Sequence, residues 1–123
     1  MATPAATPSN AFKILTAAQW AEWQRTGAFA GASIDLTDGY IHLSSADTAG
    51  ETYEKYFANS PDPLVVVEVD LRQLGESVKW EPSRGGALFP HVYGTIGKGA
   101  VVKVWEGDDV GKALFDELVR ERR

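Results

Sequence analysis

The beginning of the chain changes from an apolar run to a helical pattern. Residues 11–15 are apolar apart from one lysine, which predicts a strand. Thr16 follows where a helix N-cap belongs. Trp20 and Trp23 then lie three apart, on one face of a helix that Gly27 ends. We therefore predict a strand, a cap and a helix, with both tryptophans in the core.

A second alternating segment carries the first histidine. Asp38 and Gly39 are typical of a turn, and the residues that follow alternate between apolar and polar side chains. Because successive side chains of a strand point to opposite faces, Ile41 and Leu43 share one face of the predicted strand. The opposite face carries Tyr40, His42 and Ser44.

The middle of the chain predicts a helix followed by a central strand. Residues 47–58 have helical period, with Ser45 or Asp47 as the cap. Two prolines in residues 59–63 break this helix. Residues 64–70, LVVVEVD, are rich in β-branched side chains and apolar enough for a strand in the middle of a sheet.

The pattern of residues 71–123 predicts mainly strands and loops, followed by a final helix. We predict a turn of helix or a loop over 71–76, a strand over 78–81 and another strand over 100–105. Between these strands, GALFPHVYGTIGKG (86–99) holds a histidine among glycines and a proline, which predicts a loop because a core strand tolerates little of either. Residues 108–123 begin with acids and end with bases, as suits a final helix.

This order of elements predicts an α+β fold. We expect a mixed, mainly antiparallel β-sheet with three main helices packed against it. The chain has 123 residues, enough for one core and too few for two. We expect residues 1–10 to form a flexible tail and residues 11–123 to form a single globular domain.

Composition and charge narrow the classes of function. The net charge is −5, which disfavours non-specific nucleic-acid binding because that normally requires a surplus of Lys and Arg. The absence of cysteine excludes disulfides and thiolate chemistry. No signal-peptide pattern and no apolar span near twenty residues occurs, so we expect a cytoplasmic protein without a membrane helix. The oligomeric state is open.

Two groups of residues could carry chemistry. On the strand face that they share with Tyr40, His42 and Ser44 could contact a ligand, although a solvated sheet face explains these polar residues as well. The second group combines a carboxylate, a guanidinium, an imidazole and a phenol within thirteen residues: Glu81, Arg84, His91 and Tyr93. A structural role, in which these side chains satisfy buried backbone groups, is the alternative.

Several familiar sites do not fit the sequence. The glycine-rich segment has neither the ending of a P-loop nor dinucleotide-motif spacing. A triad of Ser44, His91 and an aspartate lacks a nucleophile elbow. The two histidines with Glu81 show no informative metal-ligand spacing, so we predict no metal site.

Four segments carry a resemblance to a known family. They are KILTAAQW, GYIHLS, VVVEVD and VKWEPSRGGALFPHVYG. In this order, over residues 11 to about 106, the chain resembles the family called domain of unknown function 952 (DUF952). That family is similar in turn to the ADP-ribosyltransferase superfamily, most of all to the catalytic half of RNA 2′-phosphotransferases.

The resemblance implies a split β-fold around a cleft that holds NAD or an ADP-ribose-like group. It implies that the first strand, with Lys13 and Thr16, contributes to ligand binding. Members of the family usually have histidine where this chain has Lys13, which puts the ribose contact of that position in question. Glu81 falls in the region where a transferase would carry its catalytic glutamate. NAD would then be a substrate, and no resident cofactor is implied.

We therefore hypothesise one cleft that binds a nucleotide-like or phosphorylated small molecule. In it, His42, Glu81 and His91 would be catalytic. Arg84 would take a phosphate, Tyr93 would contact a ring, and the remaining binding residues would be Lys13, Thr16 and Ser44. The alternative is a non-catalytic binding or sensing module that keeps the cleft.

Overall fold

The computed structural model describes residues 8–122, without the side chains of Arg84 and Arg122. The predicted tail therefore lies mostly outside the described residues, and the first strand begins at Asn10. The helices are α1 (Ala17–Thr26), α2 (Ser33–Asp38), α3 (Ala46–Tyr56) and α4 (Lys112–Arg122). The strands are β1 (Asn10–Thr16), β2 (Ala28–Phe29), β3 (Ile41–His42), β4 (Leu64–Asp70), β5 (Val78–Pro82), β6 (Leu88–Val92), β7 (Ile96–Gly97) and β8 (Val101–Glu106).

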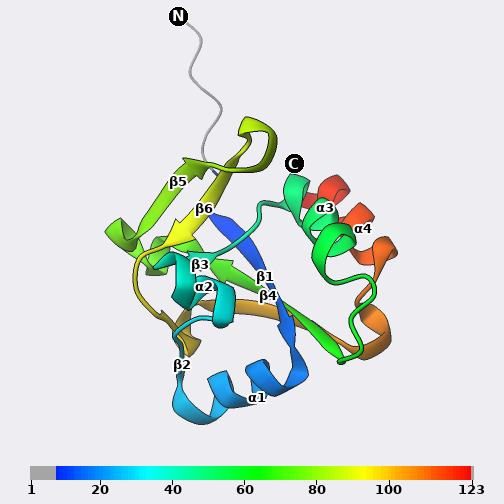
Figure 1. Cartoon of the computed structure of the whole chain (residues 1–123), viewed down its shortest axis with the longest axis horizontal. Helices are drawn as coiled ribbons and strands as arrows, with labels where there is room; N and C mark the ends of the chain where they lie inside the picture. Colours follow the sequence, from blue (N-terminus) through cyan, green and yellow to red (C-terminus); the bar gives the residue numbers. More distant parts are fainter. Residues whose placement is uncertain (1–7, 123) are drawn as a thin grey trace, which may run out of the picture.

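The strands form two three-stranded sheets and one short pair (Figure 1). Their orders are β1-β4-β8, β3-β6-β5 and β2-β7. Every strand pair formed by the described residues is antiparallel, which corrects the predicted mixed character of the sheet. The α+β class is confirmed, and α1, α3 and α4 are the three main helices.

The first sheet separates two apolar clusters. Strand β4 lies in its middle, as the sequence predicts, and alternating valines point to opposite sides. Val65, Val67 and Val69 pack with the tryptophans of α1 and with the second sheet, whereas Val66 packs with α3 and α4. Figure 1 shows α3 and α4 together on one side of β1 and β4. A strand buried on both faces needs the near-continuous apolar run that the sequence shows.

Local signals at helix ends were predicted well. Thr16 caps α1, since its hydroxyl accepts from the backbone of Gln19 and the Gln19 side chain accepts from the Thr16 N–H. Gly27 ends α1 with a φ of 87°, where a glycine avoids the steric cost of the left-handed region. Ser45 caps α3. Both tryptophans of α1 are buried, as predicted.

Asp38 and Gly39 end a helix and do not form a hairpin turn, which corrects the first prediction for this region. Asp38 is the last residue of helix α2, and Gly39 closes the helix in the left-handed conformation with a φ of 87°. An Asp-Gly pair serves either purpose because both need a positive φ at glycine. The six residues of α2 are too few for a helical period to show in the sequence.

The predicted loop over 86–99 is also corrected, because its first half is strand β6, the middle strand of the second sheet. Pro90 fits there because its carbonyl accepts from Leu43 N–H. A strand residue's nitrogen points to the same side as its carbonyl, so the missing N–H of Pro90 faces the end of short β3 and not β5.

Two further boundaries differ from the sequence prediction. Residues Gly107–Asp109 form a separate 3₁₀ turn, so the acidic pair Asp108 and Asp109 precedes α4 and does not belong to its first turn. The strand predicted around His42 is shortened to β3, and Ser44 forms an isolated bridge with Phe12 of β1. None of the helices in residues 8–122 combines the length and apolar character needed to cross a membrane.

The cap at Thr16 generates a stability prediction. Thr16→Ala removes the hydroxyl that accepts from Gln19 N–H, and we expect the free energy of unfolding to fall by about 1 kcal/mol. Urea unfolding followed by circular dichroism measures this change. Thr95→Ala, at an exposed loop position, is the control and should change stability by less than about 0.5 kcal/mol. Equal losses in both variants would contradict the capping role.

Candidate functional site

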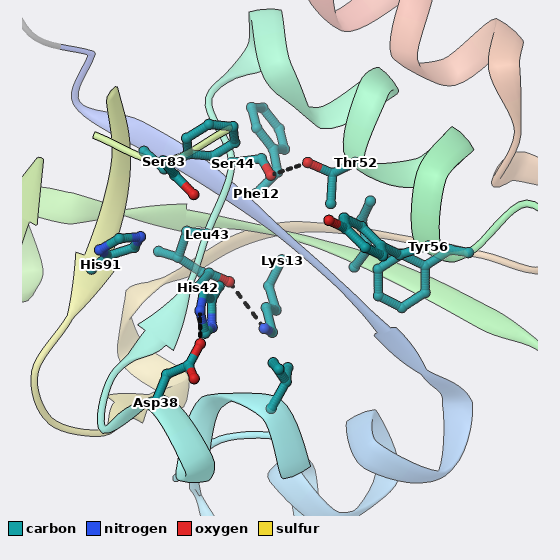
Figure 2. Close-up of a pocket in the computed structure, with 14 residues that line it drawn as sticks. Phe12, Lys13, Asp38, His42, Leu43, Ser44, Thr52, Tyr56, Ser83 and His91 are labelled. Carbon is teal, nitrogen blue, oxygen red and sulfur yellow. Dashed lines mark hydrogen bonds and ion pairs between the residues drawn. The ribbon is translucent and has the colours of Figure 1, made fainter. Parts of the chain in front are cut away.

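A pocket of about 450 Å³ opens between the two sheets and the helices α2 and α3 (Figure 2). Its size is within the range of small-molecule sites, and its walls are mainly apolar and aromatic. The described residues that line it are Phe12, Lys13, Ile14, Ile34, Asp38, His42, Leu43, Ser44, Thr52, Tyr56, Phe57, Ser83, Phe89 and His91.

The two histidines meet at one end of this pocket. His42 of β3 pairs directly with His91 of β6, and their ring centroids lie 5.5 Å apart. Two motifs that are 49 residues apart in sequence thus form one site because antiparallel pairing places opposite side chains on the same face. Figure 2 shows Tyr56 of α3 across the pocket from His91.

A carboxylate, that of Glu81, binds the edge of the His91 ring that carries Nδ1. Its Nδ1 donates to Glu81 Oε1 at 2.7 Å, from the diagonal position on β5. The phenol of Tyr93 donates to the same oxygen at 2.7 Å. His91 is buried at 3% exposure, and no side chain that the structure describes hydrogen-bonds its other nitrogen, Nε2. With one proton on Nδ1, a neutral imidazole at this position has a proton acceptor, Nε2, at the pocket wall.

The same contacts shift the titration of Glu81 and Tyr93. The hydrogen bonds from Tyr93 and then from His91 lower the pKa of Glu81. In return, the bond to Glu81 raises the pKa of Tyr93 to about 12. Glu81 thus stays ionised and keeps the proton of His91 on Nδ1, as a carboxylate does for a catalytic histidine.

Tyr40 covers the other side of the His91 ring. Their ring centroids lie 4.1 Å apart at an interplanar angle of 30°, and the Tyr40 ring also contacts His42 at 4.7 Å. Stacking on one face and a hydrogen bond at one edge leave the imidazole little freedom to turn. Tyr40 was predicted to share a face with His42, but not to position His91.

A buried network of charges holds His42. Lys13 Nζ donates to both oxygens of Asp35, at 3.2 and 3.0 Å, and to the backbone oxygen of His42 at 2.9 Å. These bonds use all three protons of the ammonium group. His42 Nδ1 donates to Asp35 Oδ1 at 2.6 Å, and Nε2 lies 2.9 Å from Asp38 Oδ2. Carboxylates only accept, so an imidazole that keeps both bonds carries two protons.

Burial and charge oppose one another in this network. Burial lowers the pKa of Lys13, and the neighbouring carboxylate of Asp35 counteracts part of that effect. Burial alone would raise the pKa of Asp35. The charge of Lys13, the bonds from His42 and the N–H of Ala32 outweigh it, and the pKa of Asp35 lies below its usual value. Lys13 and Asp35 therefore form a buried ion pair.

A second polar group lies on the β1 and α3 side of the pocket. Ser44 is 5% exposed, and its Oγ lies 3.1 Å from Oγ1 of Thr52 on α3. Thr52 donates to the carbonyl of Thr48, one helical turn earlier, at 3.1 Å. The isolated bridge to Phe12 brings Ser44 to this place, and the sequence pattern predicted only its strand face.

The structure places the predicted site residues in four different positions. His42, Ser44, His91 and Lys13 line the pocket. Glu81 and Tyr93 lie behind His91, outside the described lining, and Thr16 caps α1. The backbone of Arg84 begins the turn after β5, while its side chain lies outside the described residues. Their roles toward a ligand stay predictions.

The sequence analysis missed Asp35 and Asp38, which come from the unpredicted helix α2. Asp35 and Asp38 lie three residues apart just before His42, and this is the signal that could have indicated them, since i and i+3 share a helix face. Within residues 8–122, no three His, Asp or Glu side chains are arranged to hold a metal ion.

Comparison with known proteins identifies the family. The family described as "Protein of unknown function (DUF952)" matches residues 14–104. The chain belongs to the DUF952 family. This confirms the predicted membership, whereas the wider resemblance to ADP-ribosyltransferases stays a prediction. A comparison of the chain with curated proteins found no match.

Solved structures extend the comparison of this DUF952 chain. It is similar to the crystal structure of CC0527 from Caulobacter crescentus, with 39% identity and a TM-score of 0.80. The match covers 89% of this chain and 98% of CC0527. The solution NMR structure of CC0527 matches with 39% identity and a TM-score of 0.75, over 92% and 99% of the two chains.

The buried ion pair generates a second stability prediction. Asp35→Asn leaves the Lys13 ammonium buried without its counter-charge, and we expect a loss of about 3–5 kcal/mol in the free energy of unfolding. Asp116→Asn, which breaks the exposed pair with Lys112, is the control and should change stability little. Urea unfolding at neutral pH measures both. Similar small losses would contradict the importance of the buried pair.

The lowered pKa of Asp35 fixes the sign of its pH dependence. Its stabilising contribution is present above the ordinary pKa of 3.8 and is lost as the pH falls through the lower folded value. The stability difference between the wild type and Asp35→Asn should therefore shrink on acidification below pH 3.8.

Tyr93 provides a test of the contacts behind His91. Glu81→Gln removes the negative charge that Tyr93 faces, so the pKa of this phenol should fall from about 12 toward its ordinary value of 10.0. Absorbance at the phenolate band against pH, with Tyr93→Phe subtracted, measures it. Glu76→Gln, at an exposed position, should leave the titration unchanged. A Tyr93 titration that Glu81→Gln does not move would refute this contact.

Proposed function

We propose that the pocket binds the ring and sugar of a nucleotide-like molecule such as NAD or ADP-ribose, and that His91 acts as a general base in a transfer reaction. The observation that carries the proposal is the state of His91. Its Nδ1 is anchored by Glu81, and its Nε2 is unbonded among the described residues and faces the pocket. A carboxylate-oriented imidazole at a pocket wall is a common arrangement for proton transfer.

The pocket suits such a ligand in size and surface. A flat ring would pack against aromatic walls that include Phe89 and Tyr56, and hydroxyls of the sugar would reach the histidines. Phosphates would lie toward the turn after β5, where Ser83 lines the pocket and Arg84 follows. The resemblance to ADP-ribosyltransferases supports the same class of ligand.

The chemical step can be written for NAD as the donor. The glycosidic C1′–N bond breaks, and its electron pair leaves with nicotinamide. An acceptor hydroxyl forms the new C1′–O bond, and its proton moves to Nε2 of His91. In this proposal Glu81 acts through His91 as a positioning residue, because it contacts that ring and not the described pocket lining.

A second candidate is a binding module without catalysis. The observation that favours it is Lys13, which stands where the resemblance places a ribose-contacting histidine. Its three protons are all bonded to Asp35 and to the His42 backbone, so a ligand would have to open one of these bonds.

One experiment separates the two candidates. Calorimetric titration with NAD, ADP-ribose and a 2′-phosphorylated ribonucleotide measures binding, and chromatographic release of nicotinamide measures turnover. We expect saturable binding to the wild type, and His91→Gln should lower turnover at least about a hundredfold while Thr95→Ala retains it. Binding without turnover would favour the binding module. The absence of binding to all three compounds at millimolar concentration would refute both candidates.

A further inference from the structure

The buried hydroxyl of the pocket has a fixed direction. Thr52 has one hydroxyl proton, and it points to the carbonyl of Thr48, which can only accept. While Thr52 makes that bond, its 3.1 Å contact with Ser44 Oγ uses the proton of Ser44. Ser44 is left with lone pairs and no proton for a ligand. It therefore accepts hydrogen bonds from the pocket and does not donate them.

The imidazole of His91 also accepts hydrogen bonds from the pocket. The Nδ1–H of His91 donates a hydrogen bond to Glu81, so Nε2 is an acceptor when the ring is neutral. Lys13 lines the pocket but has no free proton, and Asp38 contributes a carboxylate. Ser83, at the exposed rim, can turn its hydroxyl either way and imposes no preference.

We infer that the buried end of the pocket selects a ring that carries two hydrogen-bond donors, such as hydroxyl or amino groups, and disfavours an anionic group there. Ser44 lies two residues after His42, the partner of His91, and is therefore diagonal to His91 just beyond the end of β3, with the two backbones roughly 7–8 Å apart. The two acceptors belong to different residues and each needs its own donor, so we place the two donors at different positions of the ring. This inference rests on the proposed function, because it concerns the substrate class of the same pocket.

Three matched compounds test the inference on the full chain. They are 1,4-benzenedimethanol with two donors, its dimethyl ether with acceptors alone, and terephthalate with two anionic groups. Amide chemical-shift titration by NMR measures the affinity of each. We expect the diol to bind at least about fivefold more tightly than the ether, and terephthalate to bind more weakly still, since an unpaired buried acceptor opposes binding.

Two variants connect this preference to Ser44. Ser44→Ala should lower the affinity for the diol roughly fivefold, to the affinity of the ether. Thr52→Val removes the partner of the Ser44 proton while keeping side-chain shape, so Ser44 becomes able to donate and the ether should gain affinity relative to the diol. Circular dichroism confirms folding of each variant, and Thr52→Val remains informative if Ser44→Ala unfolds.

The outcomes distinguish this inference from the proposed function. Equal or tighter binding of the ether or terephthalate would overturn the donor preference while the pocket remains a ligand site. Failure of all three compounds to bind would also overturn it, and ADP-ribose titrated in the same series shows whether the proposed function falls too. An unchanged preference in Thr52→Val would refute the assigned direction of the Ser44 hydroxyl.

Discussion

The ion pair between Lys13 and Asp35 is the constraint on which the site depends. It joins β1 to α2, and through the backbone and ring of His42 it joins both to β3. A buried pair contributes little net stability over apolar residues of the same shape, but losing one partner leaves a charge in the core. The network therefore penalises any arrangement in which these three elements separate. Its effect is on geometry more than on total stability.

The pocket follows from that geometry. Once β3 is fixed beside β1, pairing with β6 places His91 opposite His42, and β5 brings Glu81 behind the ring. Each histidine then has a different environment. His42 is bonded at both nitrogens by carboxylates, whereas His91 keeps Nε2 toward the pocket. One residue type thus serves as a side chain anchored at both nitrogens and as a candidate base on neighbouring strands.

Strong local patterns were predicted correctly. The apolar run of β4 required burial on both faces, and Thr16 and Gly27 carry the chemistry of helix ends in their own side chains or backbone. Weak or ambiguous patterns led to wrong predictions. The six residues of α2 are too few to show a helical period. Pro90 led us to predict a loop, but a strand tolerates it here because its missing N–H faces the end of β3, where no partner is needed. Asp35 was missed together with its helix.

The sequence by itself determined the α+β class, the central strand, the main helices and the two histidine motifs, because each depends on neighbours within about a dozen residues. Tertiary structure alone decided how the motifs combine. Lys13 meets Asp35 across 22 residues, and His42 meets His91 across 49. Such pairings depend on strand register and buried charge, which no local period encodes. The same distant contacts decide which polar atoms are already bonded and which still face a ligand.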